Sequence, residues 1–259
     1  MILIAENLNS SVPSVQKALT DQDEVFLTGL IHRLDRSPAD YLDLNAGIFR
    51  DRETAVLAGL IKLVRRHSSK PLVLDSPDPA VLKSVCPLAG PGLLLNSITL
   101  EKNRFEAMSS LAGTYAAGLI ALLMKEDRMP RTINDRLEAA DCLLNRLVQR
   151  GLSAEKIYLD PMVKPLSTDD RASLEAYQTI AALKELFPQT PVVVGLSNIS
   201  YGLPARKHIN RAFLLQAMAF GLDSAIVNTL DEDLIALCRA GNALTGHDEY
   251  CLSYLENYR

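Results

Sequence analysis

Eight short apolar segments recur along this chain, and their alternation with longer segments constrains the fold more than any other feature of the sequence. Short apolar runs bounded by polar residues are typical of strands that are buried on both faces. Two of the longer segments, 54–64 and 137–147, carry residues at helical spacing. The eight runs are Ile2 to Ala5, Tyr41 to Leu44, Leu72 to Leu74, Leu93 to Leu95, Ala117 to Leu123, Ile157 to Leu159, Val192 to Val194 and Ala225 to Val227.

Strands that alternate with amphipathic helices predict an α/β fold with parallel pairing through crossover helices. About eight such units in about 250 residues are what a closed (β/α)8 or TIM barrel requires, whereas an open doubly wound sheet has fewer strands and a glycine-rich first turn. The expected first turn, Glu6 to Ser10, contains no glycine. The run from Tyr115 to Met124 is compatible with either a strand or the start of a buried helix. Because no linker or change of composition interrupts the chain, we expect residues 1–259 to form a single barrel domain.

Charge and cysteine usage narrow the classes of partner. The chain has 27 Lys and Arg against 31 Asp and Glu, a formal net charge of −4, so we expect no nucleic acid partner. It shows neither a secretory signal pattern nor an apolar stretch long enough to cross a membrane, so we expect a cytoplasmic protein with reduced cysteines. His247 and Cys251 lie four residues apart, but no second ligand pair follows at metal-site spacing, and we expect no bound metal.

Carboxylates and amides stand directly after most of the apolar runs. In a barrel the C-terminal ends of all strands face the same rim, so these side chains would converge on one pocket. A single Asp, Asn or Ser at such a position is also typical of a helix N-cap or a turn, and the functional interpretation therefore depends on the whole set. The set comprises Glu6, Asn7, Asn9, Asp43, Asn45, Asp75, Asn96, Asp160, Ser197, Asn198 and Asn228.

The chemistry of this set favours a neutral heterocycle over a phosphate. The turn after the seventh run, 195–198, contains one glycine, and the turn after the eighth, 228–231, ends in an acid, so neither is typical of a phosphate-binding turn. A carboxylate accepts two parallel N–H bonds, and an amide supplies a donor and an acceptor together. A pterin ring offers matching edges, with donors at the 2-amino group, N3 and N8 and acceptors at O4, N1 and N5. Asp75 and Asp160 each follow three apolar residues directly and need such donors.

Seven short motifs carry a more specific signal because of their order along the chain. They are Asp43 to Gly47, Leu74 to Ser76, Asn96-Ser97, Leu159 to Pro161, Gly195 to Asn198, Ile209 to Arg211 and Gly221 to Ala225. As a set they resemble the pterin-binding methyltransferases over essentially the whole chain. More narrowly, the chain is similar to the methyltetrahydrofolate:corrinoid protein methyltransferases, which include the acetogenic corrinoid/iron-sulfur enzyme and a component of anaerobic O-demethylases.

The resemblance implies a pterin-binding TIM barrel, usually a homodimer, that moves a methyl group between N5 of tetrahydrofolate and cobalt. It places Asp75, Asn96 and Asp160 around the pterin ring and Asn198 at N5, where an amide N–H would stabilise the transition state as the catalytic group. The wider substrate-binding set that we expect adds Asp43, Asn45, Met162, Gly195, Ser197 and Arg206. The first strand departs from the family, where Gly-Glu-Arg is common: here Ala5-Glu6-Asn7 stands, and the resemblance assigns no role to Glu6 or Asn7.

A partner protein has to bring the corrinoid. The four histidines do not show the Asp-x-His-x-x-Gly pattern that ligates cobalamin in its carrier modules. The loop 162–170 is a candidate for contacting that partner. Arg206, Lys207, His208 and Arg211 form a basic group near the expected rim. We expect Arg206 to meet the glutamate tail of the folate or an acidic patch on the carrier, although a solvated helix start is also compatible with this pattern.

Two other functions stay open from the sequence. Dihydropteroate synthase resembles the same pterin barrel, but it requires cationic recognition of a diphosphate. Its family carries a lysine after the seventh strand and a Ser-x-Arg-x-His element after the eighth, where this chain has Ser197-Asn198 and Asn228 to Asp231. A noncatalytic barrel that stores or carries folate is the third interpretation, because a fold alone does not establish an activity.

Overall fold

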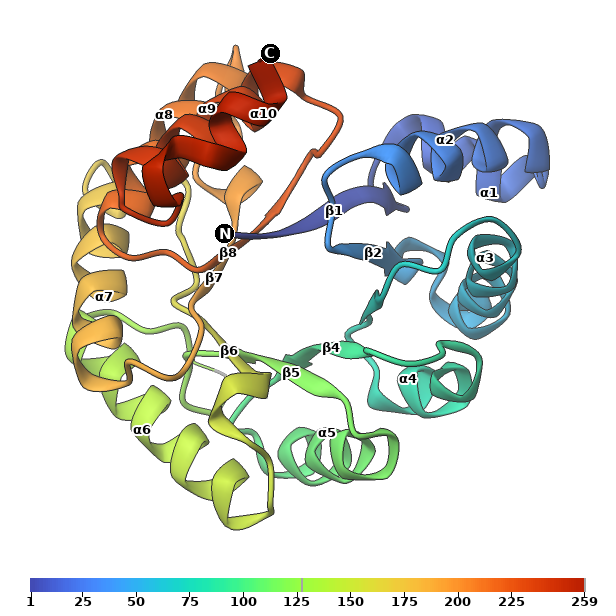
Figure 1. The fold of residues 1–259 in the computed structure, drawn as a ribbon. Helices are drawn as coiled ribbons and strands as arrows, with labels where there is room; N and C mark the ends of the chain where they lie inside the picture. Colours follow the sequence, from blue (N-terminus) through green and yellow to red (C-terminus); the bar gives the residue numbers. More distant parts are fainter. Residues whose placement is uncertain (127, 259) are drawn as a thin grey trace.

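The described residues, 1–126 and 128–258 of a computed structural model, form eight parallel strands surrounded by helices. The strand order is β6-β5-β4-β3-β2-β1-β8-β7, and the ring is closed between β6 and β7 by a single bridge from Leu159 to Val192. The (β/α)8 barrel expected from the sequence is confirmed, as the view down the barrel shows (Figure 1). The strands are β1 Ile2–Asn9, β2 Tyr41–Asn45, β3 Leu72–Asp75, β4 Leu94–Ile98, β5 Gly118–Leu122, β6 Ile157–Asp160, β7 Val193–Gly195 and β8 Ser224–Val227.

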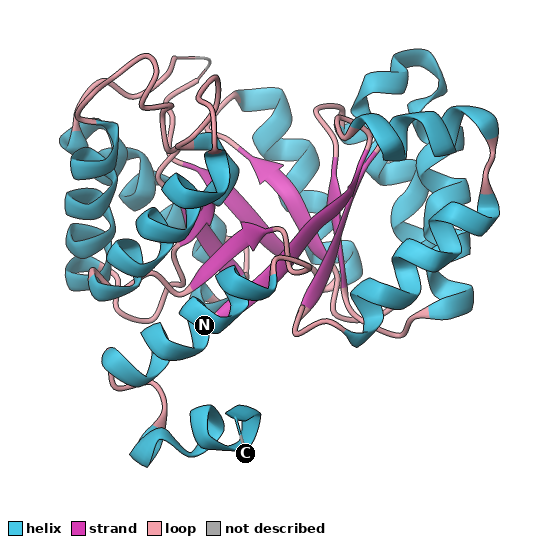
Figure 2. Cartoon of the chain, turned by 90° about the horizontal axis from the view of Figure 1, so that it is seen from above, coloured by secondary structure: helices cyan, strands magenta, loops and turns pink. Residues whose placement is uncertain are grey.

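Helices cover the outside of the barrel, and a strand-to-helix order is kept around the ring (Figure 2). The α-helices are α1 Pro13–Asp21, α2 Glu24–Arg36, α3 Glu53–His67, α4 Pro79–Val85, α5 Lys102–Tyr115, α6 Ile133–Gln149, α7 Ala172–Leu186, α8 Arg206–Ala219, α9 Glu232–Leu244 and α10 Leu252–Tyr258. Short 3-10 turns are η1 Gly47–Arg52, η2 Cys86–Leu88, η3 Ala154–Lys156, η4 Leu196–Asn198 and η5 Glu249–Cys251.

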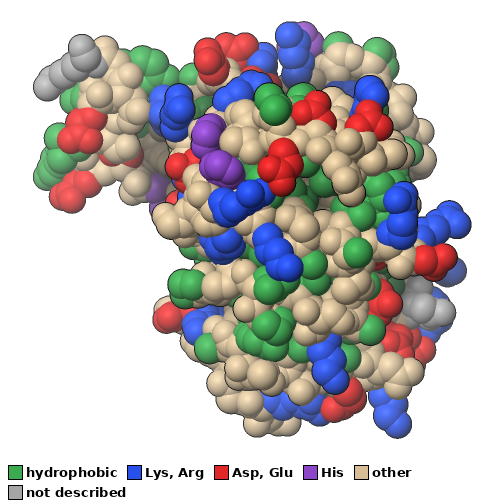
Figure 3. Space-filling model, turned by 90° about the vertical axis from the view of Figure 1, so that its right-hand side faces the viewer, with side chains coloured by type: hydrophobic (Ala, Val, Ile, Leu, Met, Phe, Trp, Pro, Cys, Tyr) green, Lys and Arg blue, Asp and Glu red, His purple; other side chains and the backbone are tan. Residues whose placement is uncertain are grey.

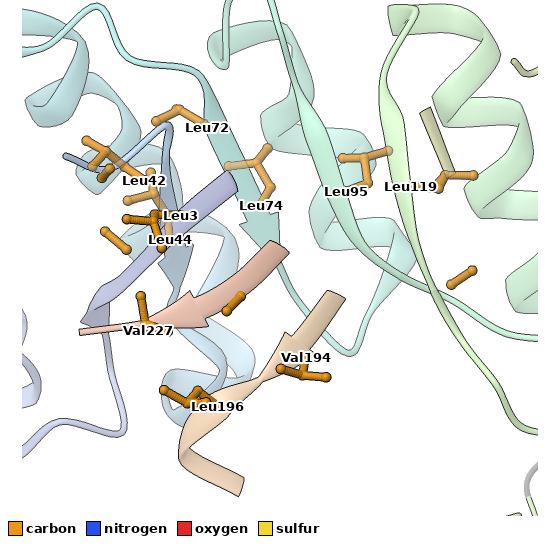
Figure 4. Packing of buried hydrophobic residues seen from close by; sticks show 14 of the residues in the cluster. Leu3, Leu42, Leu44, Leu72, Leu74, Leu95, Leu119, Val194, Leu196 and Val227 are labelled. Carbon is orange, nitrogen blue, oxygen red and sulfur yellow. The ribbon is translucent and has the colours of Figure 1, made fainter. Parts of the chain in front are cut away.

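Two apolar layers lie on the two faces of the strands. The larger one fills the space between strands and helices and extends around the barrel, with Leu42, Leu74, Leu95 and Val194 among its members (Figure 4). A smaller cluster fills the barrel itself. Burial on both faces explains why most of these strands are continuously apolar in the sequence.

The strands differ from their predicted bounds mainly at their C-terminal ends. The expected turn from Glu6 to Ser10 is wrong in its first four residues, because β1 continues to Asn9 with a register shift between Ala5 and Leu8. β2, β3 and β6 extend by one residue each to include Asn45, Asp75 and Asp160. Hydrogen bonding between neighbouring strands continues through these polar residues, because their side chains project away from the backbone ladder. The ambiguous fifth run forms a strand, Gly118–Leu122.

The helical surface is mixed in charge. On the face that lies at the right of Figure 1, Lys and Arg side chains alternate with Asp and Glu (Figure 3). Among the described residues, no helix is long and apolar enough to cross a membrane. Within the same residues, the four cysteines are free thiols, as expected.

Candidate functional site

The inside of the barrel has an apolar floor beneath a polar ring. The floor is one cluster of buried side chains: Ile4, Val73, Leu94, Ile120, Tyr158 and Val193. Side chains alternate between the two faces of a strand, so the residue two positions further along also points inward, one layer closer to the rim. Those next residues are Glu6, Asp75, Asn96, Leu122, Asp160 and Gly195. The alternation therefore brings the three residues expected to hold the pterin into the same layer.

Asp75 is fixed at the end of β3 by the neighbouring strand. Asn45 Nδ2 donates to Asp75 Oδ2 at 2.8 Å. Asn45 Oδ1 accepts from Ser10 Oγ at 3.1 Å and from the Gly47 amide at 3.0 Å, so the carboxamide is oriented on both sides. Burial raises the pKa of Asp75, and the hydrogen bond from Asn45 partly opposes that rise. Asn45 thus supports the aspartate that we expect to meet the ligand.

Arg104, on α5, ties the ends of β3 and β4 together. Its guanidinium donates to the Ser97 carbonyl at 2.9 Å, to the Ser76 carbonyl at 3.2 Å and to the Pro77 carbonyl. Asn96 precedes one of these carbonyls and is the register partner of the β3 aspartate. One half-buried cation therefore sets the relative position of two neighbouring ring residues.

Asp160 lies in the ring at the end of β6, and the turn that follows it is equally constrained. Its Oδ1 accepts from the Met162 amide at 2.7 Å. Met162 has φ 59°, a conformation that non-glycine residues adopt rarely and that the surrounding structure must hold. Arg136 Nε, itself buried, donates to the Pro161 carbonyl at 2.7 Å. Burial raises the pKa of Asp160 to about 6, although the Met162 hydrogen bond opposes the rise.

Asp43 is the most buried acid of the site, with 2% of its surface exposed. Within the described residues its Oδ1 has no hydrogen-bond partner. Burial raises its pKa well above the ordinary value, and repulsion from Asp75 and Glu6 adds to the rise. The neutral form is therefore reached more easily than in an exposed aspartate, and a protonated carboxyl can donate a hydrogen bond as well as accept one.

The β7 side of the rim is built differently. Asn198, the last residue of η4, is exposed, and its carboxamide makes no hydrogen bond to a described residue. A Cβ atom at Gly195 would lie 3.0 Å from Asn198 Nδ2, so only glycine leaves the carboxamide where it is. Ser197 Oγ donates to Glu6 Oε1 at 2.7 Å and connects η4 with β1 on the other side of β8. Glu6 is half-buried, and burial raises its pKa.

Two arginines of the basic group after β7 already have partners within the chain. Arg206 donates to the Ser197 carbonyl at 2.6 Å. Arg211 pairs with Asp231 at 2.5 Å and with Asp233 at 2.9 Å. The expectation that Arg206 meets a folate tail or a carrier stays a prediction, because its guanidinium lies beside the site while it also holds η4.

Two hollows frame the barrel. One of about 190 Å³ opens at the rim beside Glu6, Ser197 and Arg206. A larger one, of about 370 Å³, lies at the opposite end, where the strands begin, and includes Asp223. The carboxylate of Asp223 in this hollow is already bonded to the Val192 amide and to Lys184.

Sequence reasoning missed three residues that organise the site: Arg104, Arg136 and Glu6 in its contact with Ser197. The two arginines lie on helices, and nothing in their local sequence distinguishes them from solvated charges. The contact of Glu6 spans 191 positions and depends on closure of the barrel. The sequence carried a usable pattern only for the inward-facing residues of the ring, because each of them stands two positions after an inward-facing apolar residue.

The described residues contain no group of three His, Cys, Asp or Glu side chains that could hold a metal ion. His247 Nδ1 instead lies 3.0 Å from Thr245 Oγ1, and Cys251 is exposed.

Comparison with known proteins identifies the family. Residues 44–228 match the family of pterin binding enzymes. The chain belongs to this family. It is 32% identical to the methylcorrinoid:tetrahydrofolate methyltransferase of Eubacterium limosum, over 100% of this chain and 96% of that protein. It is also 28% identical to the methionine synthase of Mycobacterium tuberculosis, over 88% of this chain but only 20% of that longer protein.

Solved structures agree on the fold. Dihydropteroate synthase from Clostridium difficile, crystallised in the presence of pteroic acid, superposes with a TM-score of 0.73 at 18% identity, covering 94% of this chain and 96% of that one. The dihydropteroate synthase of Xanthomonas albilineans, in complex with 7,8-dihydropteroate, gives a TM-score of 0.69 at 16% identity, covering 93% and 94%. At these identities the likeness concerns the barrel and not the reaction.

Proposed function

We propose that this protein is a methyltransferase that moves a methyl group between N5 of tetrahydrofolate and the cobalt of a separate corrinoid protein. The observation that carries the proposal is the inward ring of Asp75, Asn96 and Asp160 with the exposed amide of Asn198 on the same rim. Full-length similarity to a methylcorrinoid:tetrahydrofolate methyltransferase supports this reaction over others of the family.

The ring residues suit the edges of a reduced pterin. The carboxylates of Asp75 and Asp160 accept N–H bonds from the ring, and the carboxamide of Asn96 supplies a donor and an acceptor together. Asp43, buried below them with an unpaired oxygen, offers one further polar atom to the ligand or to a bound water. Each of these buried or half-buried groups lacks a full set of partners among the described residues, so a ligand that lacks the matching edge would leave it unsatisfied at a cost of about 1 to 3 kcal/mol.

Asn198 acts on the atom that reacts. Transfer to cobalt breaks the N5–methyl bond and leaves its electron pair on N5, which is a poor leaving group until it is protonated or strongly hydrogen-bonded. A hydrogen bond from the amide N–H to N5 becomes stronger as electron density builds on N5. It therefore stabilises the transition state more than the bound substrate. In the reverse direction N5 of tetrahydrofolate carries a hydrogen, which the carboxamide oxygen of Asn198 can accept, so the N5 lone pair stays free to attack the methyl group on cobalt.

The partner, the assembly and the location are part of the same proposal. The corrinoid, a cobalamin-type group, arrives on a carrier protein that docks at the rim, where the loop 162–170 borders the site. Met162 at the start of this loop contacts Asp160 through its backbone. We propose a cytoplasmic homodimer that serves O-demethylation or the acetyl-CoA pathway.

The test is methyl transfer from methyltetrahydrofolate to cob(I)alamin, followed by visible absorption, with folate affinity measured separately by calorimetry. We expect wild type to be active, and Asn198→Ala to lose on the order of 100-fold in kcat with folate affinity kept within about threefold. Turnover that is unchanged in the variant would refute the role of Asn198.

Two control reactions address the rival functions. Condensation of a pterin pyrophosphate with p-aminobenzoate would identify a dihydropteroate synthase. Tight folate binding without turnover in either assay would indicate a noncatalytic barrel. Glu232→Ala, which removes an exposed carboxylate at the start of α9, serves as a neutral surface control.

A further inference from the structure

The carboxamide of Asn198 has no hydrogen-bond partner in the part of the chain that the structure describes, so its position depends on how the turn that carries it is held. It ends a three-residue turn, η4, that follows a three-residue strand. So short a segment has little regular backbone pairing to fix its direction. The neighbouring residue, Ser197, supplies the fixed point, because both its side chain and its carbonyl are bonded.

We infer that Glu6 is a positioning residue for methyl transfer: through Ser197 it fixes η4 and so aims Asn198 at N5, an inference that rests on the proposed function. Ser197 Oγ donates to Glu6 Oε1 at 2.7 Å, and the Ser197 carbonyl accepts from Arg206 at 2.6 Å. The turn is thereby clamped from both sides. β8 lies between β1 and β7 in the sheet, so the clamp connects two strands that do not pair with each other.

The burial of Glu6 makes this contact more than a surface hydrogen bond. A carboxylate that is partly removed from water needs donors, and the Ser197 hydroxyl supplies one. Hydrogen bonds to a charged group are shorter and stronger than neutral ones, so this bond resists displacement of the turn. Glu6 itself stands in the polar ring, two positions after the floor residue Ile4.

The backbone at Gly195 limits how far the Asn198 carboxamide can move toward β7. Because a Cβ there would meet Asn198 Nδ2 at 3.0 Å, the carboxamide lies directly against the β7 backbone. A tilt of η4 would therefore either press the amide on that backbone or lift it away from the ring. A misplacement of about 1 Å is enough to cost a reaction up to 100-fold.

A double-mutant cycle on kcat tests the inference with methyltetrahydrofolate and cob(I)alamin. We expect Glu6→Ala to lower kcat about tenfold with KM within about threefold, and Glu6→Gln, which keeps the acceptor, to recover most of the rate. Because Glu6 acts through Asn198, Glu6→Ala combined with Asn198→Ala should be no slower than Asn198→Ala alone. Glu232→Ala controls for loss of a carboxylate near the rim.

Several outcomes would overturn the inference. Losses that multiply in the double variant would show that Glu6 works independently of the amide. If Glu6→Ala lowered folate affinity by as large a factor as it lowered the rate, Glu6 would be a binding residue. If wild type transfers no methyl group, the proposed function fails, and the positioning role is then judged from crystals of Glu6→Ala: Ser197 and Asn198 should be displaced, and an unmoved turn refutes it.

Discussion

The two halves of the rim differ in how their functional side chains are held. On the β3–β6 side, Asp75 and Asp160 sit in the ends of strands, and Arg104 and Arg136 brace the adjoining turns from the helices. On the β7–β8 side, Asn198 is exposed at the end of a 3-10 turn, and the side chains of Glu6 and Arg206 bond to its neighbour Ser197. The first half is fixed before any ligand arrives, and the second keeps one free amide.

This difference teaches that recognition and chemistry have separate structural requirements here. Ring recognition gains from buried acids that are already oriented, because little ordering is left to do on binding. The group that we propose acts at N5 has to interact more strongly with the transition state than with the bound substrate. An amide that has no hydrogen-bond partner among the described residues is available for this interaction. Variants in each half test how sharply the two halves divide these roles.

The largest effect is expected in the braced half. Asp75→Ala removes a carboxylate that we propose accepts pterin N–H groups, so tetrahydrofolate affinity should fall on the order of 100-fold, measured by calorimetry. The matched control is Asp78→Ala, three residues further along, which caps α4 through the Ala80 amide. It should cost about 1 kcal/mol of folding free energy and leave affinity unchanged. Equal affinity losses in both variants would contradict the role of Asp75.

A smaller effect is expected from pH, also in the braced half. Because burial raises the pKa of Asp160 to about 6, the carboxylate that accepts N–H bonds is present above that pH and protonated below it. Folate affinity should therefore be constant above pH 7 and about tenfold weaker at pH 5. Asp160→Asn should bind more weakly and lose this step. A step that persists in Asp160→Asn would assign the titration to another acid.

The smallest effect is expected in the free half. Gly195→Ala places a Cβ atom 3.0 Å from Asn198 Nδ2, so the amide has to give way by a few tenths of an ångström. We expect kcat to fall a few-fold while folate affinity stays the same. Gly113→Ala, with open space around its Cβ position on α5, is the matched control. A fall in affinity without a fall in kcat would reverse the roles of the two halves.

The sequence was informative where a side chain's place depends on its own strand. Asp75 and Asp160 could be located because each directly follows a short apolar run, and barrel closure sends all such positions to one rim. Glu6 could be placed near the rim but not connected to Ser197, because the two residues are 191 positions apart in the sequence. The continuation of β1 to Asn9 was missed because polar residues follow Ala5 and suggest a turn.

By itself the sequence determined the barrel, because eight buried strands separated by helical segments have few other ways to hide their apolar faces. It also determined which acids and amides reach the rim. Only the tertiary structure decided which of them are fixed and which is free: Arg104, Arg136 and Glu6 bond to groups that lie near them only after the ring closes. Orientation depends on such long-range contacts, and local sequence patterns do not encode them.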